Sequence, residues 1–312
     1  MLGGAQHKAA ETNLRLGEIC LNRGQFDQAV DYFETSLRMY QRLGAGEDTL
    51  ASVYAWLGRT YRRQGSHENA ESSYKQSLAH YQNMEKEIDS AFVLIQLADL
   101  AFDQALAEQG RAYLKQSEDL VNGAHGTTHS LARVRRELAD QYLWQRNFAK
   151  AEELHLLGLQ DFVVLGNKRE IAWSLQALGD TYLQRGDHDK AEEQYHHALR
   201  YFTELGILHG RGYALDHLAM IKLKREKPAE ARQLFVEALE LFRASGLKDA
   251  VGYLLFNLGD AEQAAGKWNE AVRRYQESLR IWEELGNTDR ILLTKQRREE
   301  VLRKVKDTNK EG

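Results

Sequence analysis

Histidine and cysteine are the side chains whose spacing comes closest to a chemical site. His125 and His129 are four residues apart, which places two imidazoles on one face of a helix, and His196 and His197 are adjacent. Neither pair has a carboxylate or a third ligand at a sequence spacing typical of a metal site, so we interpret both pairs as solvated histidines. Cys20 is the single cysteine, and its position favours a small core residue over a nucleophile or zinc ligand. We therefore expect neither a metal nor a cofactor.

Catalytic motifs are missing from the sequence as well. It contains no Gly-x-x-x-x-Gly-Lys-Ser/Thr phosphate loop and no His-Glu-x-x-His metal helix. No constellation of acid, base and nucleophile can be assembled from its motifs. Lys and Arg total 42 against 46 Asp and Glu, and the net charge of −4 gives no field that favours nucleic acid or an anionic membrane. We expect a binding protein rather than an enzyme, with no nucleic-acid partner.

The N-terminus and the cysteine content bear on cellular location. The first eight residues do not form the apolar run of a signal peptide, and no stretch approaches the roughly 18 apolar residues of a membrane span. One cysteine cannot form an internal disulfide, which is the usual situation in a reducing compartment. These features predict a soluble, cytoplasmic protein without a membrane partner.

Long helices in a regular repeat must position any site in this chain. The only proline is Pro228, and proline is the residue that most strongly interrupts helices. A small residue recurs at intervals of 40 or 41 residues, preceded by leucine in every repeat, and we use it as the anchor of each repeat. The anchors are Gly17, Gly58, Ala98, Ala139, Gly179, Ala219 and Gly259.

Each repeat also carries small and aromatic residues at fixed distances after the anchor. Twelve residues after it stands an alanine, replaced by Gly110 in the third repeat, and four residues later a ring follows in most repeats. This spacing places the alanine and the ring on one face of a helix. Five of these second helices are expected to end at a glycine in a left-handed cap, namely Gly44, Gly166, Gly206, Gly246 and Gly286. Each repeat is therefore predicted to be a helical hairpin.

The second repeat carries a family resemblance. Residues 54–61 (Tyr-Ala-Trp-Leu-Gly-Arg-Thr-Tyr), followed by Ala70 and Tyr74, resemble the tetratricopeptide (TPR) signature, whose usual period is about 34 residues. The longer period here, with Leu-Gly-Asn corners at 165–167 and 285–287, is similar to two groups. One is the sensor region of STAND signal-transduction ATPases of the maltose-activator type, and the other comprises cell-polarity scaffolds and kinesin light chains. The resemblance implies an all-α, right-handed α-solenoid of seven hairpins.

The repeats are expected to form one superhelix over residues 1–306, followed by a disordered tail over 307–312. The third repeat is divergent, and the glycine-rich connector 122–130 is the predicted position of a bend. Residues 289–306 are expected to form a capping helix whose inner face contains Ile291, Leu292, Val301, Leu302 and Val305. The first repeat begins almost immediately after Met1, so we expect an upstream domain or another chain to cover it.

The resemblance also implies where a ligand binds. In this family the first helix of each hairpin lines the concave surface, with positions six and three before the anchor, one after it, and four to five after it pointing inward. Those positions give a groove with basic residues (Arg59, Arg62, Arg63, Arg133, Arg136), rings (Phe92, Phe102, Trp144, Trp173, Tyr213, Tyr253, Phe256), acids (Asp99, Asp140, Asp180, Asp216, Asp260) and Gln176.

Two interpretations of these residues stay open. The rings supply stacking area and the charges orient a polar ligand, which suits a peptide, a protein segment or a small-molecule inducer. Alternatively, the acid that recurs directly after the anchor serves every hairpin in the same structural way. The leading functional hypothesis is the sensor domain of a larger bacterial STAND-type ATPase. The alternative is a free-standing scaffold that joins protein partners.

Overall fold

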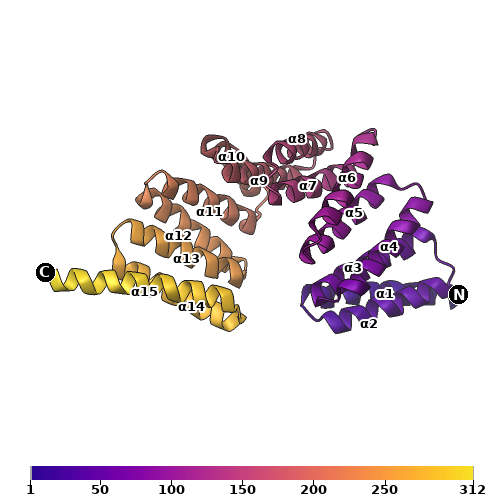
Figure 1. The fold of residues 1–312 in the computed structure, drawn as a ribbon, viewed down its shortest axis with the longest axis horizontal. Coiled ribbons are helices and arrows are strands. Elements are labelled where there is room, and N and C mark those ends of the chain that lie inside the picture. Colours follow the sequence, from indigo (N-terminus) through magenta and orange to yellow (C-terminus); the bar gives the residue numbers. More distant parts are fainter. Residues whose placement is uncertain (1, 312) are drawn as a thin grey trace. The chain divides into compact units, whose positions relative to one another are not determined.

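The computed structural model describes residues 2–311, and this range contains fifteen α-helices and no strand. The helices form seven hairpins and a final helix (Figure 1). The first helices of the hairpins are α1 (Leu2–Asn22), α3 (Glu47–Gln64), α5 (Glu87–Asp103), α7 (His129–Trp144), α9 (Lys168–Arg185), α11 (Leu208–Lys224) and α13 (Lys248–Ala264). The second helices are α2 (Phe26–Arg42), α4 (His67–Asn83), α6 (Ala107–Gly123), α8 (Phe148–Val164), α10 (His188–Glu204), α12 (Pro228–Ala244) and α14 (Trp268–Leu285), and α15 (Thr288–Glu311) follows. The predicted all-α repeat fold is confirmed.

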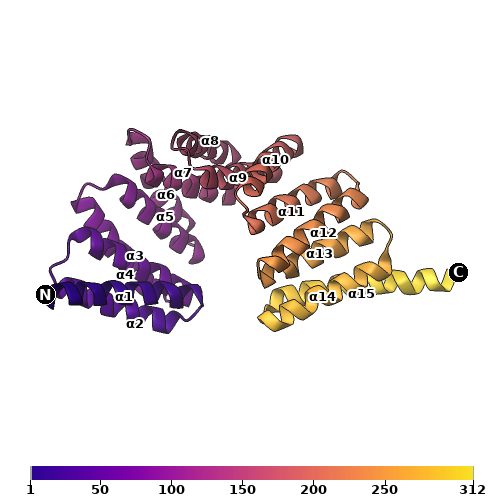
Figure 2. The same ribbon diagram turned by 180° about the vertical axis from the view of Figure 1, so that it is seen from behind.

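The chain divides into two compact units. Unit 1 ends at Leu165 and contains α1 to α8, and unit 2 begins at Gly166 and contains α9 to α15. Figure 2 shows the helices of each unit from behind. The boundary follows the fourth hairpin, whereas the predicted bend at 122–130 falls inside unit 1, where 124–128 link α6 to α7. A single continuous superhelix remains a prediction.

Each hairpin of the regular type closes around a ring that lies against the anchor. A Cβ atom added to Gly58 would lie 2.6 Å from the Tyr74 ring, and one added to Gly179 would lie 2.7 Å from the Tyr195 ring. Both rings are fully buried. The predicted small anchor and ring are therefore in contact, because the missing side chain lets the second helix approach the first closely.

The ends of the helices use left-handed residues as predicted. All five glycines expected to end second helices have positive φ, between 61° at Gly44 and 70° at Gly246. Four residues other than glycine adopt the same backbone conformation. Glu85 follows a second helix, whereas Ala105, Arg146 and Glu226 lie between the two helices of a hairpin. The repeat geometry therefore imposes this conformation, and glycine adopts it with the least strain.

The third repeat packs differently, as the sequence predicts. Leu114 stands where the other second helices carry a ring, and Phe102 of the first helix supplies the aromatic side chain instead. A Cβ atom on Gly110 would lie 2.5 Å from the Phe102 ring. Glycine replaces alanine at this position because the ring comes from the opposite helix.

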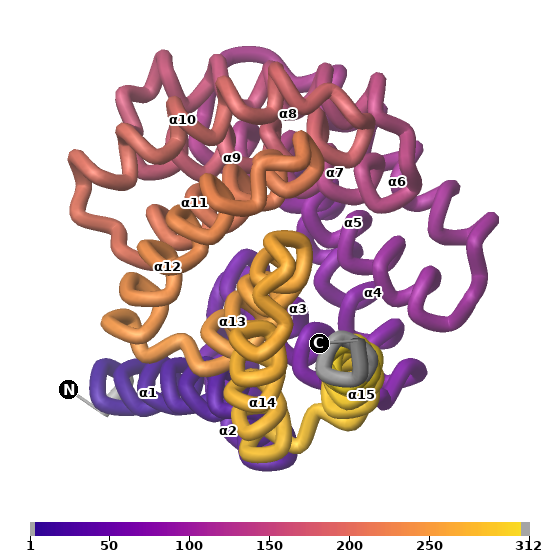
Figure 3. Tube along the Cα trace, turned by 90° about the vertical axis from the view of Figure 1, so that its left-hand side faces the viewer, coloured from indigo at the N-terminus to yellow at the C-terminus, as the bar shows by residue number. Residues whose placement is uncertain are grey.

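The final helix packs on the last hairpin (Figure 3). Val301 is fully buried and Val305 contacts the same cluster, as expected of a capping helix. The prediction that Leu292 faces inward is wrong, since this side chain is 70% exposed. Nine residues separate Leu292 from Val301, which puts them on opposite faces of a helix. The sequence predicts a disordered tail from residue 307, whereas α15 continues to Glu311.

No helix in the described range is long and apolar enough to cross a membrane.

Candidate functional site

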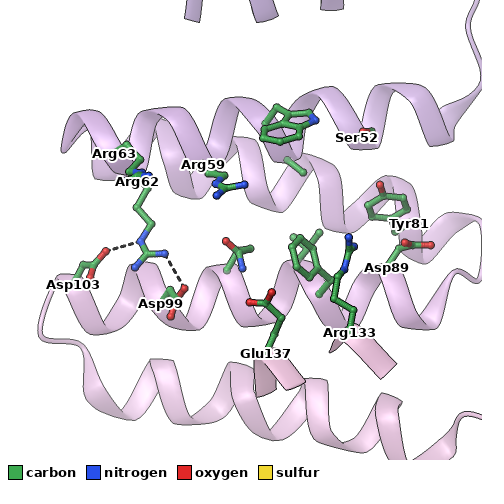
Figure 4. A pocket seen from close by; sticks show the side chains of 15 residues that line it. Ser52, Arg59, Arg62, Arg63, Tyr81, Asp89, Asp99, Asp103, Arg133 and Glu137 are labelled. Carbon is green, nitrogen blue, oxygen red and sulfur yellow. Dashed lines mark hydrogen bonds and ion pairs between the residues drawn. The ribbon is translucent and has the colours of Figure 1, made fainter. Parts of the chain in front are cut away.

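A groove lies along the first helices of unit 1, and we call it the unit 1 groove. Helices α3, α5 and α7 lie side by side, and the space that they and α4 border measures about 790 Å³ (Figure 4). The lining residues are Ser52, Ala55, Trp56, Arg59, Arg62 and Arg63 of α3, Tyr81 of α4, Asp89, Phe92, Val93, Gln96, Asp99 and Asp103 of α5, and Arg133 and Glu137 of α7. All of them belong to unit 1, so the groove is complete within one compact unit.

One small residue explains why the groove opens where it does. Six residues before the anchor, the first helices of three unit 2 hairpins carry a ring that packs edge-on against a second ring of the same hairpin, which stands on the second helix 23 residues after the anchor. The centroid distances are 4.7 Å for Trp173 and Phe202, 4.9 Å for Tyr213 and Phe242, and 4.9 Å for Tyr253 and Trp282. The second repeat has Ser52 at this position and Tyr81 as its partner. Serine cannot fill the volume of an aromatic ring, and the space beside Tyr81 stays open.

The three predicted arginines of α3 differ in what they contact. Arg62 donates to Asp103 at 2.6 Å and to Asp99 at 2.8 Å, so its charge is already paired. The Arg59 guanidinium lies over the Trp56 ring, 5.5 Å from its centroid. Among the described residues, no carboxylate is within ion-pair distance of Arg59 or Arg63. Two of the three arginines are therefore available to an anionic ligand.

The groove also contains carboxylates, which differ in the side chains that lie beside them. Burial raises the pKa of Asp99, although the Arg62 guanidinium and the Gln141 amide partly offset this effect. Burial also raises the pKa of Asp89, opposite the Arg133 side chain. The Arg133 guanidinium stacks 5.1 Å from the centroid of Phe92. Charges of both signs therefore surround an aromatic wall, an arrangement that suits a polar ligand with some apolar surface.

The acids that follow the anchors elsewhere bond within their own repeats. Tyr195 donates to Asp180 at 2.6 Å and Tyr275 donates to Asp260 at 2.5 Å. Burial raises the pKa of both carboxyl groups. These two contacts support the interpretation that the recurring acid has a structural role in its hairpin.

The remaining predicted residues lie outside the unit 1 groove. Asp140 stands 3.5 Å from His155, and Asp216 accepts from the Asn257 amide at 3.1 Å. Several others are engaged with neighbouring rings. These are Phe102 with Trp144, Trp173 with His209 and Phe256 with Tyr275, the Arg136 guanidinium over Phe162, and the Arg290 guanidinium over Tyr253. Gln176 is buried, and its amide oxygen has no hydrogen-bond partner within the described part of the chain.

The structure adds groove residues that the sequence analysis did not select. Trp56 and Glu137 stand two residues before their anchors, one position away from the template used for inward-facing residues. Tyr81 of α4 stands 23 residues after its anchor, outside the template for first helices, and it borders the open space left by Ser52. Asp103 stands five residues after its anchor, inside the template, so it could have been found. Asp89 had no signal, because it lies nine residues before the anchor, at the start of α5.

The histidine and cysteine candidates lie in different surroundings. In the described part of the chain, no group of three or more His, Cys, Asp or Glu side chains is placed to hold a metal ion. His125 and His129 are exposed, as expected of solvated histidines. Cys20 is buried, in agreement with its interpretation as a small core residue.

Comparison with known proteins identifies the repeat. The model of a family described as tetratricopeptide repeat matches residues 8–83, 130–204 and 211–289, which is more than half of the chain. The unmatched segment between the first two ranges contains the divergent third repeat. The histone-binding protein N1/N2 of Xenopus laevis is 35% identical over 75 residues, which covers 24% of this chain and 13% of that protein.

Two solved structures share the fold at low sequence identity. The STAND protein with a tetratricopeptide repeat sensor from Pyrococcus horikoshii is 18% identical, and the match covers 94% of this chain and 44% of that one, with a TM-score of 0.66. A Rap protein complexed with competence and sporulation factor is 13% identical, covering 96% and 99%, with a TM-score of 0.55. The chain thus spans less than half of the STAND protein and about an eighth of the histone-binding protein.

Proposed function

This chain belongs to the tetratricopeptide repeat family, and we propose that it binds an acidic polypeptide segment in the unit 1 groove as the sensor module of a larger signalling protein. Binding rather than catalysis is the proposed activity. The family membership supports a protein-interaction module. The groove supports the choice of an anionic partner, because it offers arginine side chains and rings but no assembled acid, base and nucleophile.

The availability of Arg59 and Arg63 is the observation that carries this proposal. Some arginines of this chain pair with a carboxylate, as Arg225 does with Asp189 and Glu192. Arg59 and Arg63 have no such partner among the described residues, and they stand one turn apart on α3, where both line the groove. Arginine binds carboxylates with two parallel hydrogen bonds, which favours it for recognising acidic side chains. The Trp56 and Phe92 rings provide apolar surface for the residues between those acids.

The sensor role rests on similarity of fold. In the STAND protein, the tetratricopeptide repeats form the sensor, and the Rap protein was solved with a bound factor. An upstream ATPase in the full reading frame would support the sensor role over that of a free-standing scaffold. The role of the rings and acids of unit 2 in the same predicted ligand groove remains a prediction.

A peptide-binding measurement tests the proposed groove. The probe is a fluorescein-labelled hexapeptide of alternating glutamate and leucine (the acidic peptide), compared with its glutamine counterpart (the neutral peptide). Fluorescence anisotropy should show preferential binding of the acidic peptide. The double substitution Arg59→Glu and Arg63→Glu should weaken that binding by at least about a hundredfold, because two attractive contacts become repulsive.

A charge-matched variant controls for the change in net charge. Arg23→Glu with Arg42→Glu alters two exposed arginines of unit 1 that do not line the groove. This variant should keep nearly the native affinity, apart from a small loss of long-range attraction that salt screens. Equal weakening in both double variants would show that net charge governs binding and would refute the groove.

A further inference from the structure

Repeats five and seven share one hydrogen bond between the first and second helix of the hairpin. The tyrosine sixteen residues after the anchor packs its ring on the anchor glycine, as Tyr195 does on Gly179. Its hydroxyl group donates to the aspartate that directly follows the anchor, at 2.6 Å for Asp180 and 2.5 Å for Asp260. The aspartate therefore satisfies a phenol that the hairpin buries.

Repeat two keeps the tyrosine and lacks the aspartate. The Tyr74 ring lies on Gly58 as Tyr195 lies on Gly179, so its hydroxyl group occupies the equivalent place. The residue that follows this anchor is Arg59, whose side chain has no acceptor for a hydrogen bond. The Tyr74 hydroxyl is fully buried and has no partner among the described residues. This repeat therefore presents two donors where repeats five and seven place a donor and an acceptor.

The carboxylates near this hydroxyl group are bound elsewhere. The charges that act on Tyr74 are those of Arg62, Asp99, Arg59 and Asp103, and all four residues line the unit 1 groove. Asp99 accepts from Arg62 and from Gln141, and Asp103 accepts from Arg62. Arg62 thus pairs with both carboxylates, and neither of them accepts from the Tyr74 hydroxyl group. A buried hydroxyl without a partner is unfavourable, and an incoming acceptor would relieve that cost.

We propose that a carboxylate of the bound polypeptide takes the place that Asp180 and Asp260 fill in their own repeats, where it accepts a hydrogen bond from the Tyr74 hydroxyl and pairs with Arg59. This assignment rests on the proposed function, because it specifies which groups bind the acidic segment. The hydroxyl group has no solvent access in the unbound chain, so this assignment requires the side chains that cover it to move as the carboxylate enters, and Arg59 is an exposed side chain. The ligand thereby completes the hydrogen bond that the sequence of repeat two leaves out.

The substitution Tyr74→Phe tests this assignment, because it removes only the hydroxyl group. Binding of the acidic peptide should weaken about tenfold, the usual effect of deleting a hydrogen bond to a charged group. Binding of the neutral peptide should not change. The melting temperature should stay the same or rise, since the lost group has no partner in the unbound chain.

Tyr195→Phe is the matched control in unit 2. It removes the same atom from the same position of another repeat, where the hydroxyl group already bonds to Asp180. The melting temperature should fall because the carboxylate loses its donor, and affinity for the acidic peptide should be unaltered. The opposite pattern, with Tyr195→Phe weakening the binding and Tyr74→Phe leaving it unchanged, would overturn the assignment.

The outcomes separate this inference from the proposed function. If Tyr74→Phe binds the acidic peptide as the native chain does, while Arg59→Glu with Arg63→Glu abolishes binding, the groove stands and the role of the hydroxyl group is refuted. If the native chain binds the acidic and neutral peptides equally well or neither of them, both proposals fail. A tenfold loss that is confined to Tyr74→Phe and the acidic peptide supports both.

Discussion

The two units use the repeat position six residues before each anchor in different ways. In unit 2, the ring six residues before each anchor packs on the second ring of its hairpin, as Trp173 does on Phe202. In unit 1, Ser52 leaves that position open, and the adjoining wall carries arginines. Only the third repeat of unit 1 has a ring at this position, as Phe92, so the first helices of this unit leave room for a groove that charged side chains line.

The position sixteen residues after the anchor, on the second helix, differs between the fourth repeat and the repeats of unit 2. Unit 2 has Tyr195, Phe235 and Tyr275 there, and all three are fully buried. The fourth repeat, in unit 1, has His155 at the same place, also almost fully buried. Burial lowers the pKa of this imidazole to about 4, and the Arg136 charge acts in the same direction. The Asp140 carboxylate lies 3.5 Å away, but it is half exposed, so burial outweighs its attraction.

The largest expected difference between the units is therefore acid sensitivity caused by His155. The folded-state pKa of about 4 lies below the ordinary value of 6.5, so unfolding takes up a proton as the pH drops. The stability is fully present above pH 6.5 and is lost as the pH falls from 6.5 toward 4. By pH 5 the loss should be roughly 2 kcal/mol, measured by urea unfolding at pH 7 and pH 5.

His155→Phe isolates this contribution from the other titrating groups. Phenylalanine is the residue that repeat six places there, as Phe235 beside the anchor Ala219, and repeat four has the matching anchor Ala139. Carboxyl groups with raised pKa, such as Asp180 and Asp216, act in the opposite direction in both proteins and cancel in the comparison. An identical loss of stability in native and substituted chains would show that His155 does not cause the acid sensitivity.

The next largest effect should come from restoring the missing ring of repeat two. Ser52→Trp gives this repeat the residue that repeat five has as Trp173, and the introduced indole should pack on Tyr81 as Trp173 packs on Phe202. Because the indole would fill part of the groove, affinity for the acidic peptide should fall at least about tenfold, or ~1.4 kcal/mol. Fluorescence anisotropy measures the affinity, and circular dichroism checks that the helices persist.

Ser72→Trp provides the comparison for this substitution. Ser72 is an exposed residue of α4 that does not line the groove, so the same indole there should leave the affinity unaltered. Native affinity in Ser52→Trp would mean that the open space beside Tyr81 takes no part in binding. The difference between the two units would then have no bearing on recognition.

The sequence predicted the hairpins well because their determinants are local. The anchor, the alanine and the ring recur at fixed short spacings, and contacts such as Gly179 with Tyr195 follow directly from them. The third repeat is an exception, because the ring of its hairpin comes from the first helix instead of the second. Phe102 replaces the missing ring of its second helix, so Gly110 makes sense only when both helices are considered together.

The candidate site was less predictable because its contacts join neighbouring repeats. A template applied one repeat at a time placed Arg62 in a ligand-binding patch, although its partners Asp99 and Asp103 lie 37 and 41 residues later. Those partners stand one and five residues after the next anchor. Phe102 and Trp144 occupy the same two positions as Arg62 and Asp103. Phe102 stands four residues after one anchor, and Trp144 stands five residues after the next. Comparing these positions between successive repeats would have identified Arg62 as already paired.

The smallest effect is expected from the exposed ion pairs that recur in unit 2. Lys248 lies 3.0 Å from Glu284, and both side chains are more than half exposed, in contrast to the largely buried pair of Arg62 with Asp99. Solvent screens such a pair, so Lys248→Met should change the free energy of unfolding by less than about 0.5 kcal/mol. Urea unfolding at low and at 1 M salt measures this, and Lys168→Met should behave alike, because Lys168 pairs with Glu204 at the same positions of repeat five. A loss above 1 kcal/mol that salt does not reduce would show that unit 2 depends on its surface charges rather than on its packed rings.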